Sequence, residues 1–455
     1  MAEQGRLTRD FTKGSIPREL TQFMLPFMAT NALQVLYSVV DMIIVGRFVG
    51  SAGLTAVSQG SLFVNFVAML ALGFFSAGQI IASQLLGAER KEELSVFEGS
   101  FFAAGIVVSA AFTLATFLLK GPAMKLLNLP GDSMQMGQEY VFICAWGVLF
   151  VSGYNVVTAI MKGLGDSRRP LIFIIAAAVA NLGLDVLFVG KLGWGVAGAA
   201  WATVIGQAAS FIAAILFFYK NREGYHCNID RSMFRIRKDI LQRVVSLGVP
   251  MSVMAAGINI TMLFVNRFVN SLGIVAASAT FGAGIKLDDI FNKISLGVQM
   301  AAAPMIGQNL GAGRHDRIKK TVYWTWVFSA VMVGIFMFAF LNFGREMFSL
   351  FVDDPAVLDL SRTFILAAIW TFPGMALMRG GNSLLNGIGN TRLLMILSFL
   401  DSFLRAATSY LFGVVLNMGF YGFVLGFAIA PYGVAVPGTI YFLSGKWEKR
   451  GRVID

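Results

Sequence analysis

Charged residues are scarce in this chain, and their scarcity decides its class. Only 13% of the 455 residues are charged and 56% are hydrophobic, whereas soluble domains carry roughly 25% charged residues. Apolar stretches of about 20 residues or more, long enough to cross a bilayer as helices, recur along the chain. Membrane β-barrels alternate in polarity instead, and runs such as 101–119, 171–189 and 321–343 are apolar on all sides. The composition therefore predicts an all-α integral membrane protein.

Cysteine and histidine are also rare. Cys144 lies in an apolar segment and Cys227 in the longest polar loop, so no disulfide framework is expected. His226 and His315 lie in loops, which disfavours a membrane enzyme with clustered ligands. The chain has no GxxxxGK[ST] phosphate loop, so neither ATP nor another cofactor is implied. The first apolar segment, of about 24 residues, is too long for a signal-peptide core and is expected to remain as the first span.

Short polar segments divide the apolar sequence into twelve predicted spans. Their ranges are 21–45, 53–85, 95–119, 135–161, 170–190, 195–219, 243–266, 274–309, 320–342, 358–385, 392–415 and 419–444. Lys and Arg concentrate in the loops on the side of the amino terminus, which predicts a multi-pass protein of the cytoplasmic (inner) membrane with both termini in the cytoplasm. These loops also explain the net charge of +11 without nucleic acid as a partner.

The two halves of the sequence repeat each other. Three matching pairs occur in the same order: VGRFVGSAGLTAVS at 45–58 with VNRFVNSLGIVAAS at 265–278, SQLLGAER at 83–90 with GQNLGAGR at 307–314, and KGLGDSR at 162–168 with NGIGNTR at 386–392. The second and third pairs have the same offset, and that of the first pair is shorter by about one helical turn. Because each half holds an even number of spans, the repeat is parallel, as in many transporters.

The repeat predicts twelve transmembrane helices in two six-helix bundles with a central cleft. The expected segments are a cytoplasmic amino-terminal segment 1–20, an N-lobe 21–219, a cytoplasmic linker 220–242, a C-lobe 243–444 and a cytoplasmic tail 445–455. Each chain carries both lobes and could work as a monomer.

Carboxyl groups inside the membrane are functional candidates, because an ionised one costs at least about 2.5 kcal/mol there. Asp289 and Asp401 each precede a cation by four residues, Lys293 and Arg405, which favours ion pairs on one helix face. Three further charged residues have no assigned partner, and their role stays open: Lys286, Asp288 and Arg379.

Asp41 and Asp185 differ, because neither has a cation three or four residues away. Both precede the outer end of an outward-running span by about four or five residues, so they lie at similar depth and could face one cavity. Desolvation and mutual repulsion would then favour the protonated form of at least one, giving a site for protons or a cation. The alternative is that they cap helices or lie in water near the outer surface.

Polar neighbours favour the functional interpretation. A stripe on the first span consists of Asn31, Gln34, Ser38 and Asp41, which lipid would disfavour. Asn181 lies one turn from Asp185, and Thr203 in the sixth span reaches comparable depth. The repeat places Thr261 and Ser409 at the positions equivalent to the two acids, so the acids belong to one half only.

Several of these segments together resemble the multidrug and toxic compound extrusion (MATE) family. They are FTKGSIPREL, VLYSVVDMIIVGRFVG, the paired SQLLGAER and GQNLGAGR, and KGLGDSRRP with NGIGNTR. The resemblance covers nearly the whole chain. It implies two six-helix lobes, alternating access and export of small-molecule organic cations across the lipid bilayer in exchange for protons or sodium ions.

The chain resembles the branch of DNA-damage-inducible F (DinF) transporters, in which acids in the first and fifth helices are functional. Asp41 and Asp185 occupy those places, and Pro26 matches a proline proposed as a hinge of the first helix. The residues expected to line the cavity are Gln34, Tyr37, Tyr140, Asn155, Asn181 and Thr203.

The sodium-coupled branch uses acids in the seventh and tenth helices instead. Here those spans offer Asn259, Asn266, Arg379 and Asn382. We therefore expect proton coupling, with Na⁺ at Asp41 and Asp185 as the alternative ion. The rival function is a flippase for lipids or lipid-linked oligosaccharides with a cationic cleft, which Arg379, Arg405 and Lys293 keep open. A channel is disfavoured because no filter sequence repeats.

Overall fold

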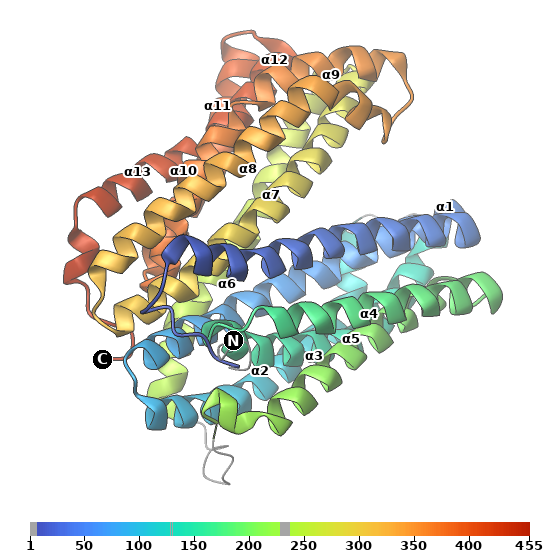
Figure 1. Ribbon diagram of the computed structural model, residues 1–455. Coiled ribbons are helices and arrows are strands. Elements are labelled where there is room, and N and C mark those ends of the chain that lie inside the picture. Colours follow the sequence, from blue (N-terminus) through green and yellow to red (C-terminus); the bar gives the residue numbers. More distant parts are fainter. Residues whose placement is uncertain (1–6, 128, 130, 228–236) are drawn as a thin grey trace. The chain divides into compact units, whose positions relative to one another are not determined.

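The computed structural model describes residues 7–127, 129, 131–227 and 237–455, with side chains for all of these except 37–39, 51, 132, 255–256, 258–260 and 263. Within these ranges the regular secondary structure is helical (Figure 1). The α-helices are α1 (Ile16–Gly87), α2 (Lys91–Leu126), α3 (Gly131–Gly163), α4 (Arg168–Asp185), α5 (Gly195–Lys220), α6 (Lys238–Asn270), α7 (Val275–Gly311), α8 (His315–Ser349), α9 (Pro355–Ala368), α10 (Thr371–Gly387), α11 (Thr391–Tyr410), α12 (Gly419–Ile429) and α13 (Tyr432–Leu443).

Helix α1 contains two spans, because its one non-helical residue, Gly50 (φ 82°, ψ −173°), separates Ile16–Gly50 from Ala52–Gly87. Among the described residues, nine helices are long and apolar enough to cross a membrane, and α9 with α10, bent by 42°, makes ten. The long helices α6 and α7 are less apolar and fall outside this count, and with them the described residues form twelve long helical segments. Helix α7 carries Lys286, Asp288, Asp289 and Lys293 in mid-helix, which lowers its hydropathy. The predicted fold class is confirmed.

The backbone repeats with the same correspondence as the sequence. Glycines with positive φ end α3 and α10 at equivalent places, Gly165 (φ 90°) and Gly389 (φ 73°). A π-helical turn follows both α4 and α11, at Val186–Lys191 and Leu411–Val415. The residues that then reverse the chain also correspond, since Gly195 (φ 56°) is equivalent to Gly419 (φ 58°). The two halves therefore share their turns as well as their helices.

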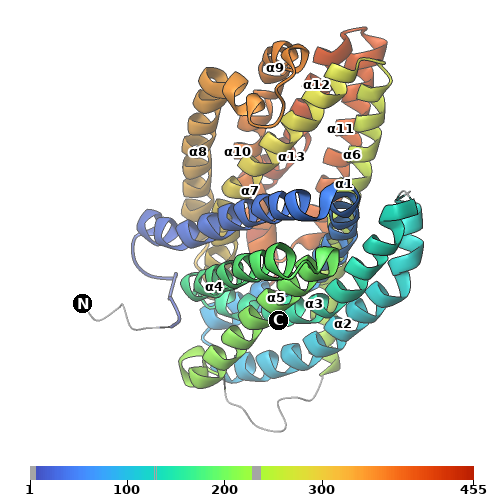
Figure 2. The same cartoon turned by 90° about the vertical axis from the view of Figure 1, so that its right-hand side faces the viewer.

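The chain folds into two compact units. Unit 1 consists of the residues up to Asp10, Ala29–Ser252 and Ile454, and unit 2 of Phe11–Met28, Val253–Val453 and Asp455. In unit 1, α3 packs between α2 and α5, and α5 packs on α4; in unit 2, α10 packs on α7, α8 and α13 (Figures 1 and 2). The predicted lobes 21–219 and 243–444 stay a prediction, because the contacts divide the chain at other residues.

Helices α1 and α6 each belong to both units, and they change unit at equivalent residues. The chain leaves unit 2 after Met28 and leaves unit 1 after Ser252, and these two residues have the same offset as the second and third matching pairs of the sequence. A proline lies two residues before each change, at Pro26 and Pro250. Although proline removes a helical hydrogen bond, α1 stays helical through Pro26.

Equivalent glycines hold these two helix halves in place. In unit 2, a Cβ at Gly297 of α7 would lie 2.7 Å from the backbone nitrogen of Met28. In unit 1, a Cβ at Gly73 would lie 2.5 Å from the backbone nitrogen of Ser252, whose hydroxyl donates to the Leu70 carbonyl at 2.5 Å. Only glycine permits backbones to approach this closely, so the packing of both halves depends on these two positions.

The segment before α1 is fixed to unit 2 by hydrogen bonds. Phe11 is fully buried, and its N–H donates to the Gln308 side chain at 2.9 Å. The Arg317 guanidinium donates to the carbonyls of Phe11, Lys13 and Gly14 at 2.9, 2.8 and 3.0 Å. A charged donor that satisfies three carbonyls holds this segment firmly.

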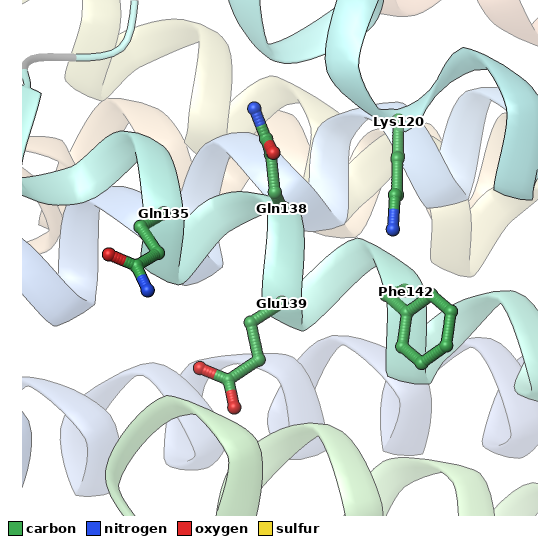
Figure 3. Close-up of a pocket in the computed structure, with 5 residues that line it drawn as sticks. All are labelled: Lys120, Gln135, Gln138, Glu139 and Phe142. Carbon is green, nitrogen blue, oxygen red and sulfur yellow. The ribbon is translucent and has the colours of Figure 1, made fainter.

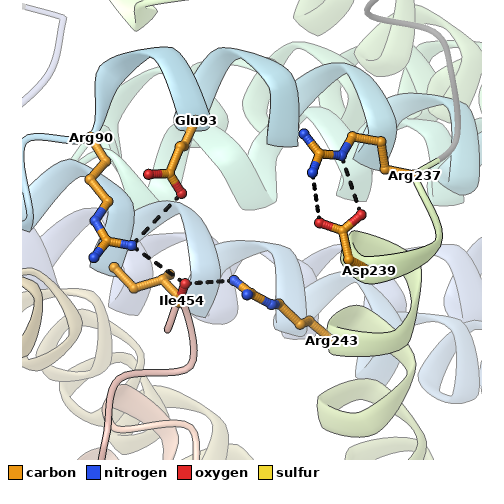
Figure 4. A network of polar contacts seen from close by, with 6 residues as sticks. All are labelled: Arg90, Glu93, Arg237, Asp239, Arg243 and Ile454. Carbon is orange, nitrogen blue, oxygen red and sulfur yellow. Dashed lines mark hydrogen bonds and ion pairs between the residues drawn. The ribbon is translucent and has the colours of Figure 1, made fainter.

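The opposite terminus is held on unit 1. The carbonyl of Ile454 accepts from Arg243 at 2.7 Å and from Arg90 at 3.5 Å, and Arg90 also pairs with Glu93 (Figure 4). Basic groups gather at this end of unit 1, and its position on the cytoplasmic side stays a prediction.

Candidate functional site

The candidate site lies in unit 1, where α1, α3 and α4 bring polar groups together. Asp41 lies on the first span of α1, and Asp185 is the last residue of α4. Their carboxyl groups are in direct electrostatic contact. The two acids that were predicted at similar depth are therefore adjacent in the fold.

Asp185 is buried and Asp41 is half-buried, and three of their four carboxyl oxygens are buried without a hydrogen-bond partner among the described residues. Asp185 is 1% exposed and Asn181, one turn earlier on α4, is 3% exposed. Both oxygens of Asp185, both amide atoms of Asn181 and Oδ1 of Asp41 make no hydrogen bond to the described part of the chain. Buried polar atoms are nearly always satisfied in folded proteins, so such a group points to a binding site for water, a proton or a cation.

Helix α5 supports the α4 side of this site. A Cβ at Gly206 would lie 3.1 Å from the Asn181 Cβ, so this glycine lets α5 approach α4 at Asn181. Thr203 lies three residues before Gly206, which places it at the level of Asp185. Its hydroxyl donates to the Ala199 carbonyl of its own helix at 3.0 Å, which leaves the oxygen lone pairs as acceptors.

Helix α3 contributes Tyr140 and Cys144. Tyr140 is 4% exposed, and its hydroxyl shares a hydrogen bond of 2.9 Å with Ser61 of α1. The Cys144 thiol contacts Tyr140 and lies within electrostatic range of Asp41. The sequence analysis missed Cys144 and Ser61 as members of the site, although the four-residue spacing of Tyr140 and Cys144 places them on one helix face.

Other predicted cavity residues lie apart from the acid pair or are not described. Asn155 is half-buried and lies about 16 Å further along α3 than Cys144, eleven residues away. Gln34 is exposed on α1. The side chain of Tyr37 lies outside the described residues. Pro26 is buried in the part of α1 that belongs to unit 2, so it is no part of this cluster.

The turn after Asp185 is unusual. The chain passes directly from α4 into a π-helical turn, in which the Leu192 N–H donates to the Leu187 carbonyl at 2.8 Å. Wide turns of this kind are frequent at functional sites because they change the register of the side chains that follow. Here the turn fixes the end of the helix that carries Asp185.

A shallow groove of about 380 Å³ on the surface of α2 and α3 is a separate feature. Figure 3 shows Lys120 reaching from α2 toward the Phe142 ring, with its ammonium 4.3 Å from the ring centroid. Phe117 also packs on Phe142 and Trp146. Aromatic rings beside a cation are typical of a helix end at the membrane interface, so we assign this groove to the bilayer boundary.

Several charged groups of unit 2 are held by ion pairs or hydrogen bonds. Arg405 pairs with Asp401 at 2.7 Å, with both side chains nearly buried, and Lys293 pairs with Asp289 at 2.7 Å on the surface. Arg379 is 3% exposed and donates to Ser295 at 3.0 Å and to Gln299 at 3.3 Å, and also to Asn292. Asp288 interacts electrostatically with Arg379 and Arg405. Both ion pairs predicted from four-residue spacing are present.

The fold and the site together define an α-helical membrane transporter with two repeated halves. The family model MatE matches residues 26–187 and 250–411, two segments of equal length that begin at equivalent positions of the repeat. These segments make up more than half of the chain, and the chain belongs to the MatE family of multidrug and toxic compound extrusion transporters. It is a transporter and not an enzyme.

Known relatives span almost the full chain. The chain is 28% identical to the probable multidrug resistance protein YpnP of Bacillus subtilis, over 96% of this chain and 97% of that protein. It is 26% identical to the multidrug export protein MepA of Staphylococcus aureus, over 83% and 81%. A solved MATE family multidrug resistance transporter in an outward-facing conformation superposes with a TM-score of 0.90 at 19% identity, over 97% of this chain and 98% of that one. The last comparison supports the fold.

Proposed function

We propose that the chain is a secondary active antiporter that exports organic cations or amphipathic drugs in exchange for protons, with Asp41 and Asp185 as the coupling site. The observation that carries this proposal is the adjacent pair of carboxyl groups, Asp185 buried and Asp41 half-buried, for which the described residues form no ion pair. Two adjacent carboxylates in a dry site must share a proton or bind a cation. The names of the relatives, multidrug resistance and multidrug export, support this class of substrate.

The mechanism follows from competition for the acid pair. A cationic compound and a proton each neutralise the same carboxyl groups, so binding one disfavours the other. In an outward-facing state, protons bind Asp41 and Asp185 and release the drug, and the protonated protein then returns inward. Each proton that enters along the field contributes about 2.3 kcal/mol per 100 mV, and one pH unit adds about 1.4 kcal/mol.

The arginines that could bind the phosphate of a flippase substrate already bind other residues of the chain. The Arg405 guanidinium holds Asp401, and the terminal nitrogens of Arg379 hold Asn292, Ser295 and Gln299. The Arg405 guanidinium and the terminal nitrogens of Arg379 would have to break these bonds to take a lipid phosphate, and the remaining donor, Arg379 Nε, is buried. This arrangement favours drug export over lipid-linked oligosaccharide transport. The cytoplasmic position of both termini, the inner membrane as location, a monomeric state and membership of the DinF-like branch complete the proposal.

The test is efflux of a fluorescent organic cation from proteoliposomes under an imposed proton gradient or an imposed sodium gradient. The native protein is compared with Asp41→Asn, and Asp289→Asn serves as the control because Asp289 is an exposed acid of unit 2. Proton-driven efflux that Asp41→Asn abolishes and Asp289→Asn retains is expected. Efflux driven by sodium alone would change the coupling ion, and unaltered efflux by Asp41→Asn would overturn the proposal.

A further inference from the structure

A second carboxyl group of unit 1, Glu98, lies in a dry environment that the antiport mechanism does not use. Glu98 lies on α2 seven residues after its first residue, and it is fully buried. Neither carboxyl oxygen makes a hydrogen bond to the described part of the chain. An ionised carboxylate without a donor is strongly disfavoured in such a place, so the group requires a proton.

The partner that faces Glu98 comes from the segment that follows α5. The Cys227 thiol interacts directly with the Glu98 carboxyl group and is 1% exposed. Cys227 follows a short 3₁₀ turn, Arg222–Tyr225, and a left-handed residue, His226 (φ 63°). The Cys227 N–H donates to the Arg222 carbonyl at 2.9 Å, which closes the turn. We call residues 222–227 the linker turn.

Tyr225 fixes the other side of the linker turn on unit 1. Its ring is fully buried and stacks on Phe218 at 5.0 Å, and its hydroxyl donates to Asp166 at 2.6 Å. Asp166 also pairs with Arg169 at 3.2 Å. The start of the predicted linker is thus held by an aromatic contact and by the contact of Cys227 with Glu98.

Unit 2 repeats this arrangement without the carboxyl group. A 3₁₀ turn at Lys446–Lys449, the equivalent of Arg222–Tyr225 in the repeat, buries Trp447 completely, and the Trp447 ring lies 6.2 Å from that of Phe442. The residue equivalent to Glu98 is Val322, which is also fully buried. The position is therefore an apolar interior position of the repeat, and only unit 1 places a titratable group there.

We propose that Glu98 is a proton-binding site whose occupancy holds the linker turn on unit 1. When protonated, the neutral carboxyl group stays in its dry place against the Cys227 thiol. When the proton leaves, the carboxylate must reach water, and Cys227 separates from α2 with the linker turn. The ligand is a proton from the side of the linker, which the proposed topology makes the cytoplasm.

The charged groups around the linker turn interact with residues other than Glu98. Arg222 interacts with the Cys227 thiol and Lys91 with His226, while Asp166 and Arg169 pair with each other beside Tyr225. Lys162 and Lys220 lie in the last turns of α3 and α5. Burial and the adjacent Glu98 raise the pKa of the Cys227 thiol above its ordinary value. While the linker turn is packed on unit 1, the Cys227 thiol therefore stays protonated and unreactive.

The experiment measures how fast N-ethylmaleimide modifies Cys227 in the full-length protein between about pH 6 and pH 9, identified by mass spectrometry of the Cys227 peptide and normalised to a free thiol at each pH. In the native protein the normalised rate should rise at least about tenfold with pH. In Glu98→Gln and Glu98→Val the rate should stay low at every pH, because the first variant imitates the protonated acid and the second the residue of unit 2. A rate that rises equally in all three proteins would overturn the proposal.

A second measurement needs no substitution. Hydrogen exchange of the linker turn in the native protein, corrected for the intrinsic pH dependence of exchange, should increase with pH, whereas that of Lys446–Lys449 should not. Equal pH dependence of the two turns would contradict a role for Glu98.

Discussion

Units 1 and 2 carry the same backbone repeat, but at three equivalent positions one unit has a charged residue and the other an uncharged one. Asn155 and Asn181 of unit 1 correspond to Arg379 and Arg405 of unit 2, and Asp185 corresponds to Ser409. The Ser409 hydroxyl donates to the Phe423 carbonyl at 3.0 Å, whereas both Asp185 oxygens lack a partner in the described part of the chain. The two units share the scaffold, and at this position unit 1 has a carboxyl group without a hydrogen-bond partner among the described residues where unit 2 has a satisfied hydroxyl.

This difference shows which half can respond to an ion. A carboxyl group that already holds an arginine gains little from a proton, because the ion pair satisfies its charge. An acid pair without a cation gains the full stabilisation from whichever cation arrives. Under the proposed mechanism, coupling therefore uses the acid pair of unit 1, while unit 2 supplies a stable frame.

The largest effect is expected when the charge of unit 2 is transferred to unit 1. Asn181→Arg places a cation one turn from Asp185, as Arg405 lies one turn from Asp401. The new cation neutralises the acid pair permanently, so proton-driven efflux should fall at least about a hundredfold. Proteoliposome efflux measures this, with Asn181→Gln as the uncharged control. If the Asn181→Arg variant transports at the native rate, then efflux does not depend on an acid pair without a neighbouring cation.

The reverse change should destabilise unit 2. Arg405→Gln leaves Asp401, whose side chain is 12% exposed, without its cation. Removing one partner of a buried ion pair costs about 3–5 kcal/mol of unfolding free energy. Adding Asp401→Asn should restore most of this loss, and thermal unfolding followed by fluorescence compares the two proteins. Equal stability of the single and double variants would show that the pair does not compensate charge.

Equal losses of stability are expected when equivalent glycines of the two units are replaced. Gly73→Ala and Gly297→Ala insert a methyl group against the backbones of Ser252 and Met28. Each should lower the unfolding free energy by about 1–3 kcal/mol, the usual cost of overpacking. The controls are Gly183→Ala and Gly334→Ala, whose new methyl groups meet no atom within 4 Å. A loss at only one of the two glycines would mean that the units are not equivalent there.

The smallest effect is expected at the surface pair of unit 2. Asp289 and Lys293 are 50% and 46% exposed, so water screens their attraction. Lys293→Ala should change the unfolding free energy by less than about 1 kcal/mol and leave efflux unchanged. A large loss of transport would assign this pair a role that its exposure does not suggest.

The sequence predicted the helical class, the twelve spans and the repeat, because long apolar runs and matched glycine-rich turns are local signals. It also predicted the ion pairs of Asp289 and Asp401, since a spacing of four residues fixes helix neighbours. The adjacency of Asp41 and Asp185 was inferred from equal depth, and the fold places them together. What these two acids do stays a prediction.

Other features depend on contacts that a linear pattern does not encode. Cys144 lies in an apolar stretch of the sequence, so no local pattern marks it as a site residue. Only the packing of α3 against α1 brings it near Asp41. The change of unit within α1 and α6 arises from close backbone contacts at Gly297 and Gly73, which lie far away in the sequence. Glu98 is buried because the linker turn folds back on α2. The sequence of this loop is polar and predicts an exposed segment instead.

The packing of Phe11–Met28 on later helices constrains the order in which the chain folds during synthesis. This segment is made first, but the residues that bury it lie on α7 and α8, and Phe11 bonds to Gln308, 297 residues later. During synthesis the ribosome delivers the amino-terminal end long before its receptor exists, so the segment must wait in an unfinished state until most of the chain has emerged. A fragment cut within the linker would lack that receptor, and two coexpressed fragments could assemble only by exchanging helix halves.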